Sequence, residues 1–354
     1  MTDRVAIMGV GAVGAAIGAY LIREGYDVTL IDQWAAHVDV MKTRGLTMTD
    51  LDGEFTVGAK ALHLHEVSNL RHKFDIIYLA VKSYDTRWST YLIEPYLKPT
   101  GFVLPAQNSL NDEIVASIVG FTRTVGCVPG ISVGIYEPGH VIRTDPPTGP
   151  PRFIVGELTG LVTPRVRRVV EALKVFGPIE ATTNIWGVRW AKLVVNCMMN
   201  ALSGIVGPSF LELEGEERET VNLVMVTIGG EVARVGSVLG VVIQPVLGIP
   251  ATEFAEAMTK ERVMTLKVKL QESIRPLSEK RLGAPERPSL LQDILKGRRT
   301  EVDFLNGLVV KKGKEVGIPT PMNQTILDLT KEIEEGKTQP RPENLERIKP
   351  YLVR

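Results

Sequence analysis

The stretch Val5-Ala6-Ile7-Met8-Gly9-Val10-Gly11-Ala12-Val13-Gly14 decides the fold of this 354-residue chain. A short apolar run ends at Gly9, residues 9–14 match the pattern G-x-G-x-x-G, and apolar residues then recur at helical spacing up to Glu24. This order predicts a strand, a tight turn and a helix. Glycines permit the turn and a close phosphate approach, and a helix N-terminus attracts anions. We expect residues 9–14 to bind the pyrophosphate of a dinucleotide.

A second apolar run, Val28-Thr29-Leu30-Ile31, ends at Asp32, where the dinucleotide pattern requires an acidic residue. A carboxylate at this position accepts hydrogen bonds from the adenosine ribose and repels a 2′-phosphate. Asp32 therefore favours NAD over NADP as the cofactor. The alternative interpretation is a solvated aspartate at the end of a strand.

Strand and helix patterns alternate up to about residue 183, and almost only helical patterns follow. Alternating strands and helices predict a parallel sheet with helices on its faces. We therefore expect an α/β protein with an N-terminal Rossmann dinucleotide-binding domain at residues 1–183 and an all-helical C-terminal domain at 184–337. The polar, proline-containing tail at 338–354 is expected to be a flexible arm or an oligomer contact.

The composition excludes several classes of protein. Lys+Arg and Asp+Glu both number 41, so no net field favours nucleic acid or a membrane surface. Cys127 and Cys197 stand far apart, which fits a reducing compartment. Neither a signal peptide nor an apolar run of about 20 residues is recognisable. We expect a cytoplasmic protein that binds a small molecule rather than nucleic acid or a membrane.

A polar stripe stands out in the helical half. Lys192, Asn196 and Asn200 are four residues apart, so they lie on one face of a helix that is otherwise apolar. Buried amides and a buried ammonium need partners, so the stripe is expected to line a substrate cleft, with Lys192 as general acid. Alternatively, Lys192 reaches solvent and the two asparagines bond neighbouring helices.

Two polar residues follow predicted strands in the first half. Lys82 follows the apolar run 75–81, and Asn108 follows the run 101–105. Ligands bind outside the carboxyl ends of parallel strands, which predicts a role for both residues near cofactor and substrate. The alternatives are an ordinary surface lysine and an asparagine that only forms a turn.

With these residues in view, the sequence resembles the ketopantoate reductase (2-dehydropantoate 2-reductase) family over most of its length. The markers are Gly9 to Gly14, Val81-Lys82, Gln107-Asn108, Lys192-Leu193-Val194-Val195-Asn196 with Asn200, Ser289 to Asp293, and Thr300 to Gly307. The resemblance implies a helical domain like the C-terminal domain of 6-phosphogluconate dehydrogenase, and a homodimer.

The resemblance also implies hydride transfer between a nicotinamide and a 2-oxo acid or 2-hydroxy acid. Lys192 would donate the proton to the carbonyl oxygen, and Glu301 would contact a substrate hydroxyl or Lys192. By the same resemblance, Lys82 and Asn108 would lie between the cofactor and the substrate. Asn196 and Asn200 would hydrogen-bond the substrate, and Ser289 would contact its carboxylate. From the residues alone, Ser289 is equally well the N-cap of a helix that begins at Leu290, and Glu301 a solvated helix residue.

Some features depart from the family. Pantoate-forming reductases prefer NADP, whereas Asp32 favours NAD. Ser109 stands where the family has glycine, and residues 244–288 and the tail are longer than in compact members. Two alternatives therefore stay open, a β-hydroxyacid dehydrogenase of the 6-phosphogluconate dehydrogenase type and a protein that senses NAD(H) without turnover.

The histidines do not suggest a metal site. His63 and His65 alternate with leucines, which predicts that both lie on one face of a strand. No third ligand is apparent nearby, so no metal is expected.

Overall fold

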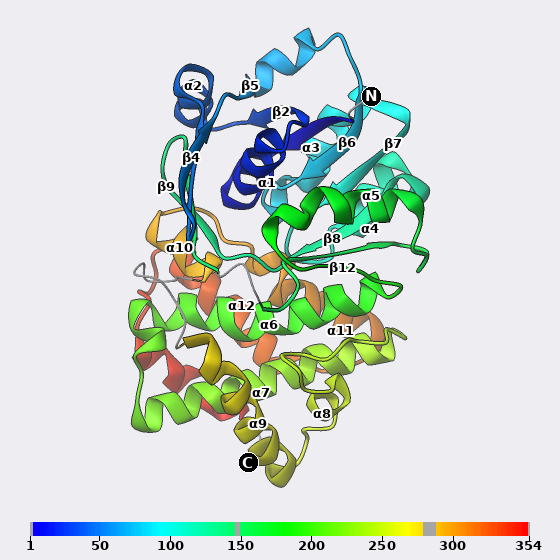
Figure 1. Ribbon diagram of the computed structural model, residues 1–354. Helices are drawn as coiled ribbons and strands as arrows, with labels where there is room; N and C mark the ends of the chain where they lie inside the picture. Colours follow the sequence, from blue (N-terminus) through cyan, green and yellow to red (C-terminus); the bar gives the residue numbers. More distant parts are fainter. Residues whose placement is uncertain (1–2, 146–148, 279–287, 353–354) are drawn as a thin grey trace. The chain divides into compact units, whose positions relative to one another are not determined.

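The computed structural model describes residues 3–145, 149–278 and 288–352. Contacts within the chain divide it into two units, Met1–Ile185 and Trp186–Arg354. Figure 1 shows strands and helices in the first unit and helices in the second. The predicted class, an α/β domain followed by a helical domain, is confirmed.

The centre of the first unit is a five-stranded parallel sheet with the order β5-β2-β1-β6-β7. Its strands are β1 (Arg4–Met8), β2 (Asp27–Asp32), β5 (Lys60–His63), β6 (Phe74–Leu79) and β7 (Leu97–Pro105). From β1 the chain adds β2 and then β5 on one side of the sheet. It then crosses back and adds β6 and β7 on the other side of β1. Ligands bind at such a reversal, outside the carboxyl ends of the strands.

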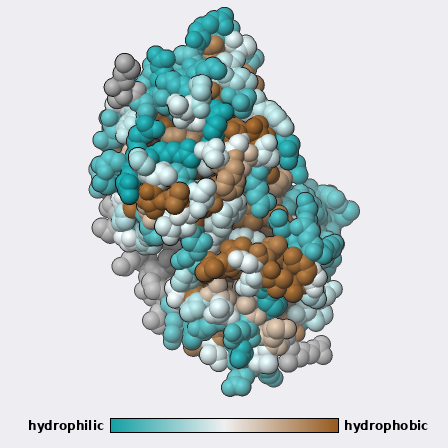
Figure 2. Space-filling view, turned by 90° about the vertical axis from the view of Figure 1, so that its right-hand side faces the viewer, coloured by the Kyte–Doolittle hydropathy of each residue, from teal (hydrophilic) through white to brown (hydrophobic). Residues whose placement is uncertain are grey.

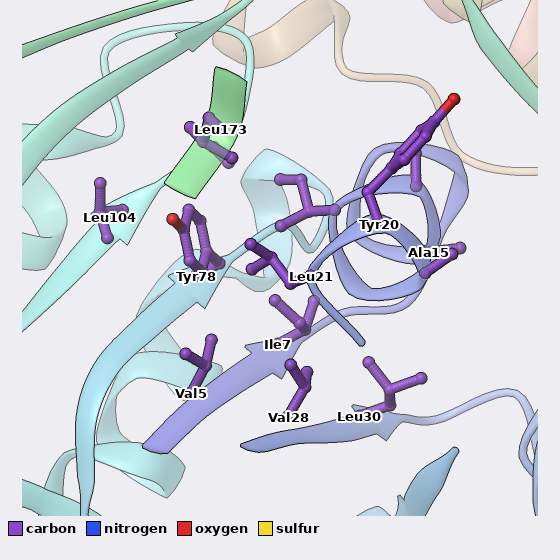
Figure 3. Close-up of a cluster of buried hydrophobic side chains, with 14 of the residues drawn as sticks. Val5, Ile7, Ala15, Tyr20, Leu21, Val28, Leu30, Tyr78, Leu104 and Leu173 are labelled. Carbon is purple, nitrogen blue, oxygen red and sulfur yellow. The ribbon is translucent and has the colours of Figure 1, made fainter. Parts of the chain in front are cut away.

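Side chains on both faces of this sheet are buried, because successive residues of a strand point to opposite faces. Ile7 and Leu30 belong to one hydrophobic cluster, and Met8 and Ile31 belong to the other. Figure 3 shows Ile7 and Leu30 pointing from the sheet toward the helix that carries Leu21. Burial on both faces explains why these strands are continuous apolar runs rather than alternating ones.

Two smaller sheets complete the first unit. The first has the order β4-β3-β10-β9 and the second the order β12-β11-β8. Their strands are β3 (Leu46–Asp50), β4 (Gly53–Val57), β8 (Val125–Pro129), β9 (Val133–Glu137), β10 (His140–Arg143), β11 (Phe153–Glu157) and β12 (Ile179–Ala181). The helix α1 (Ala12–Arg23) contacts both the parallel sheet and the four-stranded sheet.

The prediction for His63 and His65 is wrong. His63 ends β5, but His65 lies in the 3₁₀ helix η1 (Leu64–Asn69), so the two do not share a strand. Their rings stack with centroids 5.4 Å apart. The strand ends here because the Glu66 side chain accepts a hydrogen bond from the His63 N–H at 2.8 Å and caps the 3₁₀ turn.

The other helices of the first unit connect these strands. They are α2 (Ala35–Arg44), η2 (Ser83–Asp85), α3 (Thr86–Ile93), η3 (Glu94–Tyr96), α4 (Asp112–Val119), η4 (Phe121–Arg123), α5 (Pro164–Leu173) and η5 (Lys174–Phe176).

The second unit is built of helices, and among its described residues the longest connection, 239–250, contains an isolated antiparallel bridge between Val246 and Ile249. The helices are α6 (Ile185–Val206), η6 (Pro208–Leu211), α7 (Gly215–Val238), α8 (Ala251–Ala255), α9 (Lys260–Ser278), α10 (Ser289–Leu295), η7 (Val302–Phe304), α11 (Asn306–Val316), α12 (Pro321–Glu334), η8 (Pro342–Arg347) and η9 (Lys349–Tyr351). By length and composition α7 could cross a bilayer, but 78% of its apolar window is buried inside the protein. Such burial is typical of a core helix.

The described part of the C-terminal tail is hydrogen-bonded to the helical unit, and its role as a flexible arm or an oligomer contact stays a prediction. The Arg341 N–H and the Asn344 side-chain amide both donate to the Ile205 carbonyl near the end of α6, at 2.9 and 3.0 Å.

Large apolar side chains are exposed at and after the end of α7, at Val238 and Val242. Figure 2 shows one face of the molecule, on which hydrophobic side chains gather in patches.

Candidate active site

The glycine loop between β1 and α1 has the geometry that dinucleotide binding requires. Gly9 has a φ of +90°, and a Cβ there would lie 2.5 Å from the Val81 nitrogen. A Cβ on Gly14 would lie 2.0 Å from the Gly9 oxygen. A Cβ on Gly11, by contrast, would meet nothing within 4 Å. Open space therefore lies at the N-terminus of α1, where a pyrophosphate would approach the backbone.

Asp32 is held against this loop. One of its carboxylate oxygens accepts a hydrogen bond from the Val10 N–H at 2.5 Å, and the other accepts from the Trp34 N–H at 2.7 Å. The side chain is only half-buried, so a ligand can still reach it. Each carboxylate oxygen has a second acceptor direction, which leaves capacity for ribose hydroxyls. The residues of the loop and Asp32 thus suit a nicotinamide dinucleotide, although their contacts with it stay predictions.

Trp34 and His37, which follow Asp32, were not predicted to have a role. Their rings stack with centroids 5.2 Å apart, and His37 is fully buried. Burial lowers the pKa of His37, with the Asp32 charge acting in the opposite sense. Its Nδ1 accepts the Gly139 N–H at 2.8 Å, which ties the start of α2 to the turn between β9 and β10. No sequence pattern signals this link, because Gly139 lies 102 residues away.

The loops that follow β6 and β7 are bound to each other. The Gln107 amide donates to the Val81 carbonyl at 2.7 Å, and the Asn111 amide donates to the Ser83 hydroxyl at 3.0 Å and to the Asn108 carbonyl at 2.8 Å. In the sequence, Lys82 stands between the two acceptors Val81 and Ser83, directly before η2. The structure thus brings the segments of Lys82 and Asn108 together at the carboxyl ends of neighbouring strands. Asn111 is a supporting residue that the sequence did not reveal.

In the helical unit, α6 carries the polar stripe. The Asn200 amide donates weakly to the Asn196 side-chain oxygen at 3.4 Å and to the Ser289 hydroxyl at 3.3 Å. Three of the residues predicted to bind substrate therefore lie together. Asn196 is only 4% exposed, and its amide nitrogen has no hydrogen-bond partner among the described residues. A buried amide without an acceptor costs free energy, so a substrate oxygen or a water would stabilise it.

Lys192 lies one helical turn before Asn196 on α6 and is half-buried. Burial lowers the pKa of Lys192 from its ordinary 10.5, because removal from water disfavours the charged ammonium. A lysine whose pKa is shifted toward neutral pH can donate a proton in one direction of a reaction and accept it in the other.

The structure contradicts the two alternatives that assigned Ser289 and Glu301 only structural roles, an N-cap and a solvated helix residue. Ser289 is the first residue of α10, and Pro288 occupies the N-cap position, so the N-cap alternative for Ser289 is wrong. Glu301 is 7% exposed and precedes η7, so it is not a solvated helix residue. Its contact with substrate or Lys192 stays a prediction.

A buried hydrogen-bond network links four helices of this unit. The Glu231 carboxylate accepts from the N–H groups of Met322 and Asn323, both at 2.9 Å, and from the Asn323 amide at 2.7 Å. Asn323 in turn accepts from the Asn306 amide at 2.9 Å, and that amide also approaches the Cys197 carbonyl at 3.4 Å. Burial raises the pKa of Glu231, and the three donors oppose this shift. The network was not predicted, since its members are far apart in sequence.

No metal-binding group appears in the part of the chain that the structure describes. Residues 3–145, 149–278 and 288–352 contain no cluster of three or more His, Cys, Asp or Glu side chains placed to hold a metal ion.

Comparisons with known proteins identify the family of the chain. A family model described as "Ketopantoate reductase PanE/ApbA" matches residues 5–159, and one described as "Ketopantoate reductase PanE/ApbA C terminal" matches residues 184–334. A 2-dehydropantoate 2-reductase from Archaeoglobus fulgidus is 30% identical over 337 residues, covering 94% of this chain and 99% of the relative.

Solved structures share the architecture. A ketopantoate reductase of the PanE/ApbA family from Ralstonia eutropha is 27% identical with a TM-score of 0.74, covering 94% of this chain and 99% of its own. A D-mandelate dehydrogenase solved with NADH and anilino(oxo)acetate is 24% identical with a TM-score of 0.77 and the same coverage, which shows a common fold. The resemblance found in the sequence is thus confirmed, and the chain belongs to the ketopantoate reductase family of NAD(P)-dependent oxidoreductases.

Proposed function

We propose that this chain reduces a 2-oxo acid to the 2-hydroxy acid with NADH, and oxidises the hydroxy acid in the reverse direction. The observation that carries the proposal is the half-buried Lys192, with its lowered pKa, in one helical stripe with Asn196 and Asn200. A protein that only senses the dinucleotide would gain nothing from a desolvated lysine beside amides. The relatives with this family's name act on the 2-oxo acid 2-dehydropantoate.

The roles of the helical residues follow from their chemistry. The nicotinamide, when bound, supplies the hydride that adds to the oxo carbon. As the carbonyl oxygen becomes an alkoxide, the Lys192 ammonium donates a proton to it, which completes the hydroxyl group. The Asn196 amide nitrogen, which has no partner among the described residues, can donate to a substrate oxygen, and Asn200 and Ser289 would hydrogen-bond the acid beside it. Glu301 would hold either a substrate hydroxyl or Lys192.

The roles of the first unit concern the cofactor. Gly9 to Gly14 would bind the pyrophosphate, and Asp32 would accept from the ribose hydroxyls and exclude a 2′-phosphate. Lys82 and Asn108 would meet the nicotinamide end and the substrate. NADH as the cofactor is further supported by the D-mandelate dehydrogenase of similar fold, which was solved with NADH.

The assembly and location of the chain are also proposals. A related ketopantoate reductase from Staphylococcus aureus is described as dimeric, and two-fold dimers are the commonest oligomers. We propose that the chain is a cytoplasmic protein and forms a homodimer, and sedimentation of the purified protein would test the dimer.

One experiment tests the activity. Oxidation of NADH and NADPH is followed by absorbance with a panel of 2-oxo acids for the wild type, Lys192→Met and the control Lys314→Met, which alters an exposed lysine on α11. We expect Lys192→Met to lower kcat by about 100-fold or more, as for other general acids, and Lys314→Met to match the wild type. The wild-type kcat/KM should also show a pH limb below 10.5 that Lys192→Met lacks.

Two results would refute the proposal. If the wild type binds NADH but turns over no 2-oxo or 2-hydroxy acid, the chain is a sensor of the dinucleotide. If Lys192→Met retains more than about a tenth of the activity, the proton comes from another group.

A further inference from the structure

His37 lies near the start of α2, and its imidazole ring is fully buried. Its Nδ1 accepts the N–H group of Gly139, in the turn between β9 and β10, at 2.8 Å. A neutral imidazole has one acceptor nitrogen and one donor nitrogen, so this bond fixes the ring proton on Nε2. The ring is therefore held in one tautomer and one orientation.

The turn that holds His37 is itself fixed. Gly139 is buried, and its carbonyl accepts the N–H group of Thr47 on β3 at 2.8 Å. A Cβ on Gly139 would lie 2.2 Å from Cγ1 of Val40, so the turn packs directly on α2. Both backbone hydrogen-bonding groups of Gly139 are thus bound, and the turn is a rigid anchor for the His37 ring.

The His37 ring also supports the residues that hold Asp32. It stacks on the Trp34 indole, with the centroids 5.2 Å apart and the ring planes 19° apart. The Trp34 N–H donates to one Asp32 oxygen at 2.7 Å, and the Val10 N–H of the glycine loop donates to the other at 2.5 Å. Burial lowers the pKa of His37, and the Asp32 charge and the Val10 backbone oppose this shift, so both lie near the ring. A continuous path of contacts therefore runs from the turn at Gly139 to Asp32.

We propose that His37 is a positioning residue for the cofactor, which keeps the Asp32 carboxylate where it meets the adenosine ribose. The inference rests on the proposed function, because it requires Asp32 to bind that ribose. A ligand-binding group has to be held to within about half an ångström, and the packing of the residues behind it supplies this precision. An acceptor alone would satisfy the Gly139 N–H, whereas the ring that stacks on Trp34 extends the contact to Asp32.

The test uses ADP-ribose, which is the adenosine and pyrophosphate part of the dinucleotide, and its 2′-phosphate derivative. Dissociation constants are measured by calorimetry for the wild type, His37→Leu and His37→Phe, and for each of them combined with Asp32→Ala. His37→Leu removes both the ring and the acceptor, whereas His37→Phe keeps a ring on Trp34 and removes only the acceptor. His65→Leu, which replaces an exposed histidine of η1, is the matched control.

We expect His37→Leu to weaken the binding of ADP-ribose by about fivefold or more, which is in the range for residues of one contact network, and His37→Phe to weaken it less. The 2′-phosphate derivative should lose less affinity than ADP-ribose, because a displaced carboxylate loses its ribose contact and no longer repels the phosphate as strongly. With Asp32→Ala, both His37 substitutions should change the affinity by less than about twofold, because no carboxylate remains to be positioned. His65→Leu should match the wild type.

Two results would overturn the inference. Equal losses of ADP-ribose affinity with and without the Asp32 carboxylate would show that His37 acts on another part of the site. A lower Tm with an unchanged affinity for ADP-ribose would leave His37 with a structural role alone. If His37→Leu does not fold, His37→Phe is judged by the same two criteria. If the wild type binds neither NADH nor ADP-ribose, the proposed cofactor site is wrong, and this result is distinct from the other two.

Discussion

Replacing Asp32 by asparagine should weaken the choice of NADH over NADPH and also destabilise the first unit. The carboxylate accepts the N–H groups of Val10 and Trp34 with separate oxygens. Asparagine keeps one acceptor and turns an NH₂ group toward the other N–H. One charge-assisted hydrogen bond is lost, so the free energy of unfolding should fall by about 1.5–3 kcal/mol.

The effect on the cofactor follows from charge. A carboxylate and a phosphate of about two negative charges, about 5 Å apart, repel each other by about 1.7 kcal/mol even at the dielectric constant of water. This energy corresponds to a factor of roughly 17 in affinity, and a lower effective dielectric constant would enlarge it. Asp32→Asn removes the repulsion and one ribose acceptor. The ratio of the NADPH and NADH dissociation constants should therefore fall by at least about tenfold.

The assay is titration of each cofactor by nucleotide fluorescence, together with urea unfolding of the unliganded protein. Asp39→Asn removes an exposed carboxylate from the neighbouring helix α2 and serves as the control for net charge. The reasoning is refuted if the wild type prefers NADPH. It is also refuted if the ratio changes by less than about threefold, or if Asp39→Asn changes it as much as Asp32→Asn does.

Three further predictions concern glycine geometry and buried charge. Gly11→Ala should fold normally, but its Cβ enters the open space where the pyrophosphate would approach, so its affinity for NADH in titrations should fall. Gly14→Ala should lower Tm, because its Cβ collides with the Gly9 oxygen. Equal losses of Tm in the two variants would contradict this reasoning. Because burial lowers the folded-state pKa of Lys192, its charge costs stability below that pKa, and the cost disappears as the pH approaches 10.5. Lys192→Met should therefore raise the free energy of urea unfolding at about pH 7, and a gain that does not shrink toward about pH 10 would count against the shift. Glu231→Gln should lower the free energy of unfolding by about 1–3 kcal/mol, because its NH₂ group faces N–H donors. The pKa of Glu231 is raised in the fold, so its contribution is complete below pH 4.5 and falls as the pH rises through the folded pKa. The deficit of Glu231→Gln in urea unfolding should thus be larger at acidic pH, and a deficit that grows with pH would refute the sign.

The sequence predicted those parts of the site whose geometry is local. The glycine loop, Asp32, and the stripe of Lys192, Asn196 and Asn200 depend on spacing along one turn, one strand or one helix, and that spacing is readable without tertiary contacts. The buried strands were recognisable for the same reason, since burial on both faces of a sheet requires continuous apolar runs.

The parts that were missed depend on long-range contacts. Gly139 reaches His37 across 102 residues, and Glu231 reaches Asn323 across 92. Each partner alone is an ordinary turn or helix residue, so no local pattern marks it. The short strands β3 and β4 were also missed. Side chains of β4 are exposed or half-buried, and in β3 the buried Leu46 and Met48 alternate with polar residues over only five positions.

The network around Glu231 has a consequence for the order in which the helical unit forms. Thr320, at the N-cap position of α12, makes no side-chain cap, and the N–H groups of Met322 and Asn323 are instead bound by a carboxylate from α7. The first turn of α12 is therefore completed by a residue that is close only after the helices have packed. Amide hydrogen exchange at Met322 and Asn323 should then require opening of the whole unit, whereas the ends of independently capped helices exchange by local fraying.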